Sequence, residues 1–240
     1  MLAHSSSAHS VSKELANEKD KVMTDADSRL PTQLSPIEIS SSNKELEWID
    51  RQQKVKEAFS HAWSGYKKFA MGYDEFMPLS QQGVDVLGGL GATIVDALDT
   101  SMIMGLDEVV SEAGLWIESD LSERISRKHE VSLFETTIRV LGGLLSAYHL
   151  SSGDQGMNIT HKALKGPKPI VYLDIARNLA DHLLSAFTSS PTTFTDVVLH
   201  ESSAHGRISC TAEVSTLQLE FNYLSTISDD LKYCREDVKQ

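Results

Sequence analysis

The sequence is poor in cysteine, in basic residues and in long apolar runs, and each shortage excludes a class of protein. Cys210 and Cys234 are its only cysteines, too few for a disulfide scaffold or a zinc site built from cysteine alone. The chain has 22 Lys and Arg residues against 34 Asp and Glu, a formal net charge of -12, which argues against nucleic acid or an anionic membrane surface as a partner. No apolar run reaches about 18 residues, and the N-terminus MLAHSSSAHS has neither the basic nor the apolar region of a signal peptide. The two cysteines are compatible with free thiols or with a pair bridged in an oxidising compartment.

The alternation that marks strands is also nearly absent, whereas helical spacing recurs along the chain. Residues 1–45 are Ser-rich, charged and poor in aromatics, which predicts a disordered leader. Apolar spacing predicts helices at about 48–69, 92–104, 107–121, 131–150, 171–187 and 211–225. We therefore predict an all-α domain over residues 46–240, built from helical hairpins that long loops join on one side.

The stretch from His129 to Leu150, HEVSLFETTIRVLGGLLSAYHL, places a carboxylate and a guanidinium on an otherwise apolar helix. The helical period predicts one packed stripe and, beside it, a strip of polar and small residues. The packed stripe is Phe134, Ile138, Leu141, Leu145 and Tyr148, and the second strip is Glu135, Arg139, Gly142, Gly143 and Ser146. Because glycine inside a helix costs about 1 kcal/mol relative to alanine, two glycines there indicate close approach of a backbone or a ligand. Such a helix suits the wall of a cavity.

Each charged candidate also has an ordinary structural explanation. A Glu–Arg pair four residues apart, such as Glu135 and Arg139, is typical of a surface ion pair worth about 0.3–0.5 kcal/mol. Two acidic pairs each share a helix face, namely Asp96 with Asp99 and Glu213 with Glu220. The aspartates could serve a helix start or nearby backbone groups, and the glutamates could form a solvated edge.

Two other motifs do not fit the chemistry that they resemble. The segment GLGATI at Gly89–Ile94 begins like a dinucleotide-binding loop but lacks the third glycine. The segment HESSAH at His200–His205 separates its imidazoles by five positions. On a helix of 3.6 residues per turn, that spacing turns them about 140° apart, so they could not chelate zinc as a zinc-protease helix does.

Three segments together resemble one known family. LFETTIRVLGGLLSAYHL at Leu133–Leu150, IVDALDTSMIMGL at Ile94–Leu106 and TAEVSTLQLEFNYLS at Thr211–Ser225 match, in order, the class I α-1,2-mannosidases, glycosyl hydrolase family 47. The resemblance runs from about residue 48 to 228. It implies an (αα)-barrel of seven hairpins, of which this chain supplies about three. It also implies a mannosyl-oligosaccharide 1,2-alpha-mannosidase that removes terminal α-1,2-linked mannose from N-glycans with inversion.

The resemblance also implies roles for particular residues. Glu135 matches the general acid, and Arg139 would orient it. Asp99 and Glu213 look like members of the acidic cluster that holds mannose hydroxyls, with Glu220 a weaker candidate. The family binds Ca²⁺, but its anchoring ligands and its base have no match here, so we expect no metal ligand in this chain and no activity from these 240 residues alone.

The implied partners are high-mannose N-glycans on glycoproteins in the endoplasmic reticulum or Golgi, with membrane attachment only through an anchor that this sequence does not show. The sequon Asn158-Ile159-Thr160 agrees with a lumenal location. Two alternatives remain: a lectin-like factor that recognises mannose glycans in quality control, and an unrelated all-α interaction module.

Overall fold

The structure is a computed structural model that describes residues 41–152, 166–187, 194–206 and 210–237. The chain divides into two parts, Met1–Asp50 and Arg51–Gln240, and each is treated by itself. In the first part the description begins with helix at Ser41. The rest of the predicted leader, the sequon at Asn158 and most of the loop around it lie outside the described residues.

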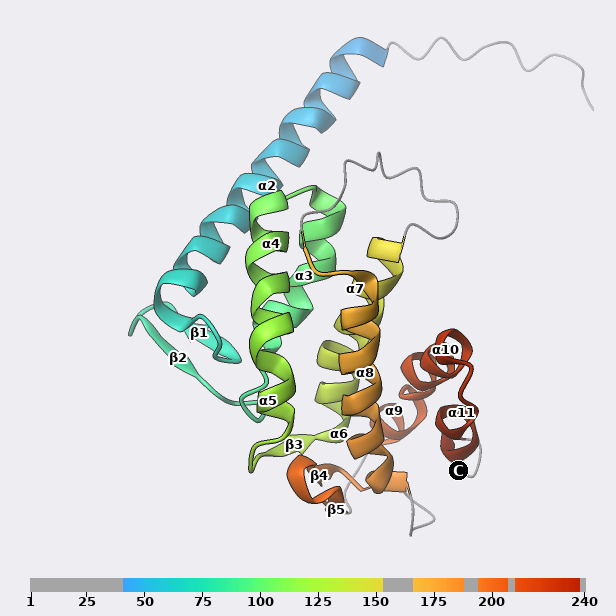
Figure 1. The fold of residues 1–240 in the computed structure, drawn as a ribbon. Helices are drawn as coiled ribbons and strands as arrows, with labels where there is room; N and C mark the ends of the chain where they lie inside the picture. The colour runs from blue at the N-terminus through green and yellow to red at the C-terminus, as the bar shows by residue number, and fades with distance from the viewer. Residues whose placement is uncertain (1–40, 153–165, 188–193, 207–209, 238–240) are drawn as a thin grey trace, which may run out of the picture. The chain divides into compact units, whose positions relative to one another are not determined.

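The second part is mainly helical, which confirms the predicted fold class (Figure 1). The α-helices are α2 (Ser41–Ala70, which begins in the first part), α3 (Ala92–Met104), α4 (Asp107–Trp116), α5 (Ser122–Ile125), α6 (Leu133–Glu135), α7 (Gly142–Ser152), α8 (Pro169–Leu183), α9 (Thr211–Ser215), α10 (Gln218–Ser228) and α11 (Lys232–Asp237). The strands are β1 (Glu75–Met77), β2 (Gln82–Val84), β3 (Glu130–Ser132), β4 (Asp196–Val198) and β5 (Ser203–His205). Across the described ranges, no helix has the length and apolar character needed to cross a membrane.

The core forms where the longer helices meet. Helix α7 packs against both α3 and α8, and α3 also packs against α4 (Figure 1). The largest fully buried side chains are Tyr172, Tyr233, Phe221, Leu90, Ile94, Leu98, Ile117, Leu121, Ile125, Leu141, Leu144 and Leu179. They come from the segment between Leu90 and Tyr233, and they belong to one continuous apolar core.

A buried carboxylate fixes the loop that leads into α3. Asp74 is fully buried, and its side chain accepts hydrogen bonds from the backbone N–H groups of Leu87 (2.8 Å), Gly89 (2.8 Å) and Ala92 (3.1 Å). Gly91 precedes the helix with a φ of 69°, and a Cβ there would lie 2.4 Å from the Trp116 ring. Only glycine fits this position, because the backbone is left-handed and the indole occupies the space. The start of α3 is therefore fixed by the hydrogen bonds to Asp74 and by the contact between Gly91 and Trp116.

Two π-helical turns change the register of the long helices. They cover Ile117–Leu121, after α4, and Thr136–Leu141, between α6 and α7. A π turn spaces its hydrogen bonds five residues apart, so the face that follows it is rotated relative to an α-helix. The predicted packed stripe was therefore partly wrong: Phe134, Ile138 and Tyr148 are only half-buried. Leu133, Thr137, Val140, Leu144 and Ala147 are buried instead.

Short strands are a second departure from the prediction. The strands β1 and β2 form an antiparallel hairpin, and β3, β4 and β5 form an antiparallel sheet in that order. Three-residue strands are too short to show the alternation that identifies a strand in a sequence. The β3–β5 sheet draws part of the long 188–209 connection against the segment that leads into α6, where Leu133 N–H donates to Thr195 O at 2.8 Å.

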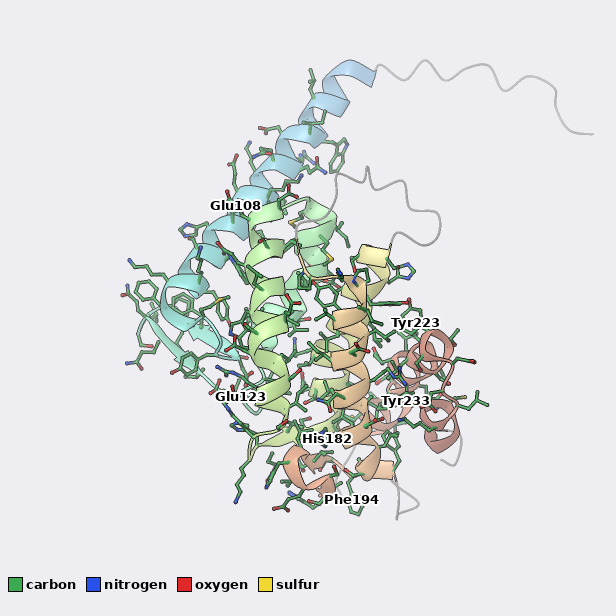
Figure 2. All side chains as sticks on the ribbon, in the orientation of Figure 1. Glu108, Glu123, His182, Phe194, Tyr223 and Tyr233 are labelled. Atoms are coloured by element: carbon green, nitrogen blue, oxygen red, sulfur yellow. The ribbon has the colours of Figure 1, made fainter. Side chains whose placement is uncertain are left out.

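The C-terminal helices are tied to α7 and α8 by tyrosines labelled in Figure 2. The Tyr223 hydroxyl of α10 is 2.8 Å from His149 Nδ1, and the Tyr233 hydroxyl of α11 donates to Asp181 Oδ1 of α8 at 2.8 Å. The predicted helix over 211–225 is divided at Thr216 and Leu217 into α9 and α10.

A glycine allows the closest contact between α3 and α7. A Cβ on Gly143 would lie 2.8 Å from the Val95 carbonyl oxygen, a distance that real Cβ atoms do not show. At the neighbouring Gly142, a Cβ would meet its nearest atom at 3.5 Å, an ordinary contact. These adjacent positions of one helix therefore form a matched pair.

We predict that Gly143→Ala lowers the free energy of unfolding by about 1–3 kcal/mol, because the added methyl forces α3 and α7 apart. Gly142→Ala should be neutral or stabilise by up to about 1 kcal/mol, because alanine is the better helix former. Urea denaturation of both variants measures the difference. Equal stability of the two would show that the α3–α7 contact tolerates a side chain.

Candidate functional site

Arg139 joins two carboxylates that come from different helices. Its Nε donates to Glu135 Oε2 at 2.7 Å, and its Nη1 donates to Asp96 Oδ2 of α3 at 3.1 Å. The predicted Glu135–Arg139 pair is therefore present, and it extends to a third residue 43 positions away in the sequence. We call these three residues the Arg139 bridge.

Local structure brings each member into place. Ser132 caps the helix that carries Glu135, since its Oγ accepts from the Glu135 N–H at 3.4 Å. Arg139 lies within the π turn that follows, and its side chain is half-buried. Because Gly143 lets α7 approach α3 closely, Asp96 comes within reach of the guanidinium. Backbone geometry therefore positions all three charged groups.

The charges of the Arg139 bridge contribute little to folding. The side chains are 42% (Arg139), 33% (Glu135) and 49% (Asp96) exposed, so water screens the ion pairs, and each is worth about 1 kcal/mol or less. The hydrogen bond to Glu135 raises the pKa of Arg139 further above its ordinary value, against an opposing effect of burial. The guanidinium thus remains a fixed positive charge that orients two carboxylates on an accessible surface.

Glu220, on α10, lies close to Gly142, the first residue of α7 after the π turn that carries Arg139. A Cβ on Gly142 would be 3.7 Å from Glu220 Oε1, an ordinary contact distance. Glu220 Oε2 is buried without a hydrogen-bond partner among the described residues. Burial raises the pKa of Glu220, against a smaller effect of its own backbone N–H. An unsatisfied, desolvated carboxyl is a candidate for a functional group.

The other two predicted sugar ligands have local partners. Asp99 Oδ1 accepts from the backbone N–H of Thr100 at 2.5 Å, and Glu213 Oε2 accepts from the backbone N–H of Cys210 at 2.9 Å. In the described part of the chain, no hydrogen bond or ion pair joins either residue to Arg139. Of the two aspartates predicted to share a face of α3, Asp96 is the one that contacts Arg139.

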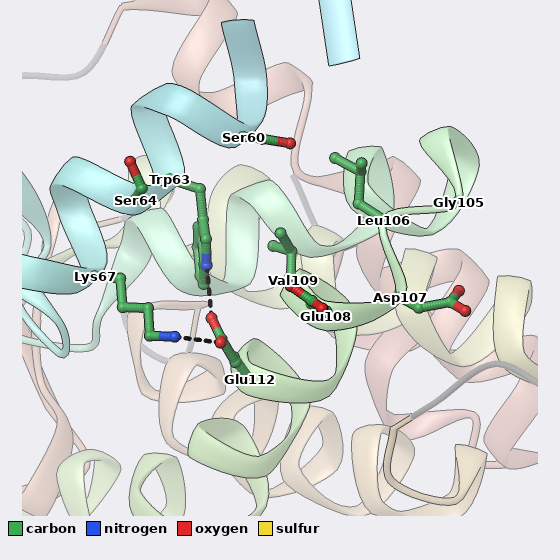
Figure 3. Close-up of a pocket in the computed structure, with 10 residues that line it drawn as sticks. All are labelled: Ser60, Trp63, Ser64, Lys67, Gly105, Leu106, Asp107, Glu108, Val109 and Glu112. Carbon is green, nitrogen blue, oxygen red and sulfur yellow. Dashed lines mark hydrogen bonds and ion pairs between the residues drawn. The ribbon is translucent and has the colours of Figure 1, made fainter. Parts of the chain in front are cut away.

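The pocket drawn in Figure 3 is separate from these residues. It has a volume of about 410 Å³ and lies between α2 and the segment from Gly105 to Glu112. Trp63 Nε1 donates to Glu112 Oε2 at 3.0 Å, and Lys67 pairs with the other oxygen. Burial tends to raise the pKa of Glu112, but the hydrogen bonds from Lys67 and Trp63 outweigh it and lower the pKa. The carboxylate of Glu112 is therefore satisfied by two partners within the protein.

The arrangement defines a helical domain that carries the partly exposed Arg139 bridge on its surface. A family model described as Glycosyl hydrolase family 47 matches residues 58–239. The chain belongs to this family, and the resemblance seen in the sequence is confirmed.

Known relatives agree in sequence and in fold. The chain is 65% identical over 227 residues to mannosyl-oligosaccharide 1,2-alpha-mannosidase MNS3 of Arabidopsis thaliana, covering 88% of this chain and 36% of that protein. It is 40% identical over 188 residues to the human endoplasmic reticulum mannosyl-oligosaccharide 1,2-alpha-mannosidase, covering 76% and 24%. The solved alpha-1,2-mannosidase from Trichoderma reesei matches with a TM-score of 0.67 and 30% identity, over 79% of this chain and 39% of that one. The chain therefore spans well under half the length of each of these proteins.

We predict that Glu220→Gln stabilises the fold at neutral pH. Because burial raises the pKa of this carboxyl in the folded state, its ionisation favours unfolding at pH values above the ordinary glutamate pKa of about 4.3. The melting temperature of the variant should exceed that of the wild type at pH 7, and the gap should close at about pH 3.5.

Glu118→Gln, at an exposed position, is the control and should change the melting temperature at neither pH. If Glu220→Gln and the wild type have the same melting temperature at pH 7, the charged Glu220 carboxylate does not destabilise the fold.

Proposed function

We propose that the protein is a mannosyl-oligosaccharide 1,2-alpha-mannosidase that removes terminal α-1,2-linked mannose from N-glycans with inversion. The observation that carries the proposal is the Arg139 bridge, because it fixes Glu135 on an accessible helix face. The names of the relatives from Arabidopsis, human and Trichoderma support the same activity and linkage.

Glycosidic cleavage needs a carboxylic acid at the leaving oxygen and a carboxylate that activates water. We assign the acid to Glu135. Arg139 contacts its Oε2, so proton transfer falls to Oε1, either directly or through one water. The guanidinium holds the carboxyl in one orientation, and it stabilises the negative charge left when the proton departs.

The neighbouring acids would bind sugar hydroxyls rather than transfer the proton. Asp96 is held by Arg139, and its exposed carboxylate can accept from a hydroxyl. Glu220 Oε2 has no hydrogen-bond partner among the described residues, so a sugar hydroxyl that reaches it would supply one. We keep Asp99 and Glu213 as proposed sugar contacts, although each now has a backbone partner.

The family resemblance implies Ca²⁺, and the described residues do not fit it at this site. Ca²⁺ takes about six to eight oxygen ligands. Arg139 already pairs with Glu135 and Asp96, and the described chain groups no third acid with them as a metal-ligand set. No catalytic step is therefore assigned to the ion.

The proposed substrates are high-mannose N-glycans on glycoproteins, and the proposed location is the endoplasmic reticulum or Golgi. The name of the human relative, an endoplasmic reticulum mannosyl-oligosaccharide 1,2-alpha-mannosidase, supports the substrate class and the endoplasmic reticulum. The net charge of -12 supports a partner other than nucleic acid.

In the intact protein, meaning a version that spans the full length of the mannosidase relatives, Glu135→Gln should lower the turnover of an α-1,2-linked mannose oligosaccharide by about 10²-fold or more, the scale expected for loss of a general acid. Free mannose release measures the turnover, and calorimetry measures glycan binding. The melting temperature should change little, because the ion pair is solvent-exposed.

Glu118→Gln is the matched control and should retain full turnover. Near-normal mannose release by Glu135→Gln would show that Glu135 is structural. Glycan binding without release by the wild type would favour the lectin-like alternative, and neither binding nor release would favour an interaction module.

A further inference from the structure

A second group of candidate metal ligands lies away from the Arg139 bridge, on the β3–β5 sheet. The ligand atoms of Glu130, Asp196 and His205 all lie within 4.8 Å of one another. Each residue comes from a different strand, β3, β4 and β5 respectively. We propose that these three side chains bind a divalent transition-metal ion such as Zn²⁺, which clamps the three strands together.

The strand register explains how the three side chains meet. Asp196 pairs directly with His205, and Glu130 pairs with Val198, two residues from Asp196 on the same strand. Alternate residues of a strand share a face, so Glu130, Asp196 and His205 project from the same side of the sheet. Val131 and Val197, on the opposite side, are buried in the core. One face of the sheet therefore packs on the core, and the other face carries the three candidate metal-binding side chains.

The distances are close to those of a metal site. Ligands that lie about 2.1 Å from an ion can be at most about 4.2 Å apart. Contraction from 4.8 Å needs only small side-chain rotations, and His205 Nε2 already lies 3.3 Å from Glu130 Oε2. The Thr195 hydroxyl donates to Asp196 Oδ2 and so steadies that carboxylate, as outer hydrogen bonds do in metal sites.

The types of ligand select the class of ion. Two carboxylates and a neutral imidazole carry a charge of about -2, which a dication neutralises. Imidazole favours Zn²⁺ and similar transition metals over Ca²⁺ and Mg²⁺, which prefer oxygen. The side chains of Glu130 and His205 are 57% and 53% exposed, so an ion can reach the site and water can complete its coordination.

The sheet is also connected to the acid-bearing helix. Leu133, which follows β3, donates its N–H to Thr195 O at 2.8 Å, and Ser132 caps the helix at Glu135. An ion that joins β3 to β4 and β5 would hold these strands at the point where α6 begins. The clamp is a structural role, so its test does not depend on glycosidase activity.

Titration calorimetry of the metal-free protein with Zn²⁺ should show one site per chain, with a dissociation constant in the micromolar range. His205→Asn and the double variant Glu130→Gln/Asp196→Asn should each weaken binding by at least about 10-fold, since loss of even an outer partner costs about 10–100-fold. His61→Asn, which changes an exposed histidine of α2, is the control and should bind as the wild type does. Zn²⁺ should raise the melting temperature of the wild type and of His61→Asn alone.

Spectroscopy with Co²⁺ separates this site from the two thiols. Ligation by nitrogen and oxygen gives no thiolate charge-transfer band, whereas binding at Cys210 or Cys234 would give one. Three results would each overturn the proposal: no saturable Zn²⁺ binding, unchanged affinity in folded His205→Asn, or a thiolate band. If the wild type binds no metal while His205→Asn lowers the melting temperature, the cluster is an ion pair only.

Discussion

The close contact between α3 and α7 is the constraint on which the candidate site depends. Gly143 has no side chain, so the α7 backbone can lie against the Val95 carbonyl, and this closeness brings Asp96 within 3.1 Å of Arg139. A methyl group at Gly143 would clash with α3, and separation of the helices would open the link between Arg139 and Asp96. The geometry of the charged groups is therefore set by backbone packing, and the ion pairs are too exposed to impose it.

The acids near this contact are in unequal environments. Glu135 pairs with a permanent cation, whereas Glu220 is partly buried and has an oxygen without a partner in the described structure. A fold selected only for stability would not retain a desolvated carboxyl where glutamine would serve. The groups near the α3–α7 contact are thus held in fixed orientations, but one of them lacks a hydrogen-bond partner among the described residues. This combination agrees with the proposed binding of a sugar ligand.

The sequence allowed the helical class, the bounds of α3 and the Glu135–Arg139 pair to be predicted, because each depends on spacing within one helix. The packed stripe could not be predicted correctly, since a π turn rotates the face after Glu135 and has no reliable signature in composition. The contact of Asp96 with Arg139 and the burial of Glu220 depend on tertiary packing. The strands that carry Asp196 and His205 lie within a connection, and the strand that carries Glu130 overlaps the start of the helix predicted at about 131–150. At three residues each, these strands are too short for periodicity to reveal them.

The most direct measurement of the central claim is the anomeric configuration of the first mannose that the intact protein releases. An α-1,2-linked mannose disaccharide would be supplied, and proton NMR would follow the product before mutarotation. An acid at Glu135 with a water attacking from the opposite face requires inversion, so β-mannose should be the first product. Release of α-mannose first, or no release by the intact protein, would contradict the account.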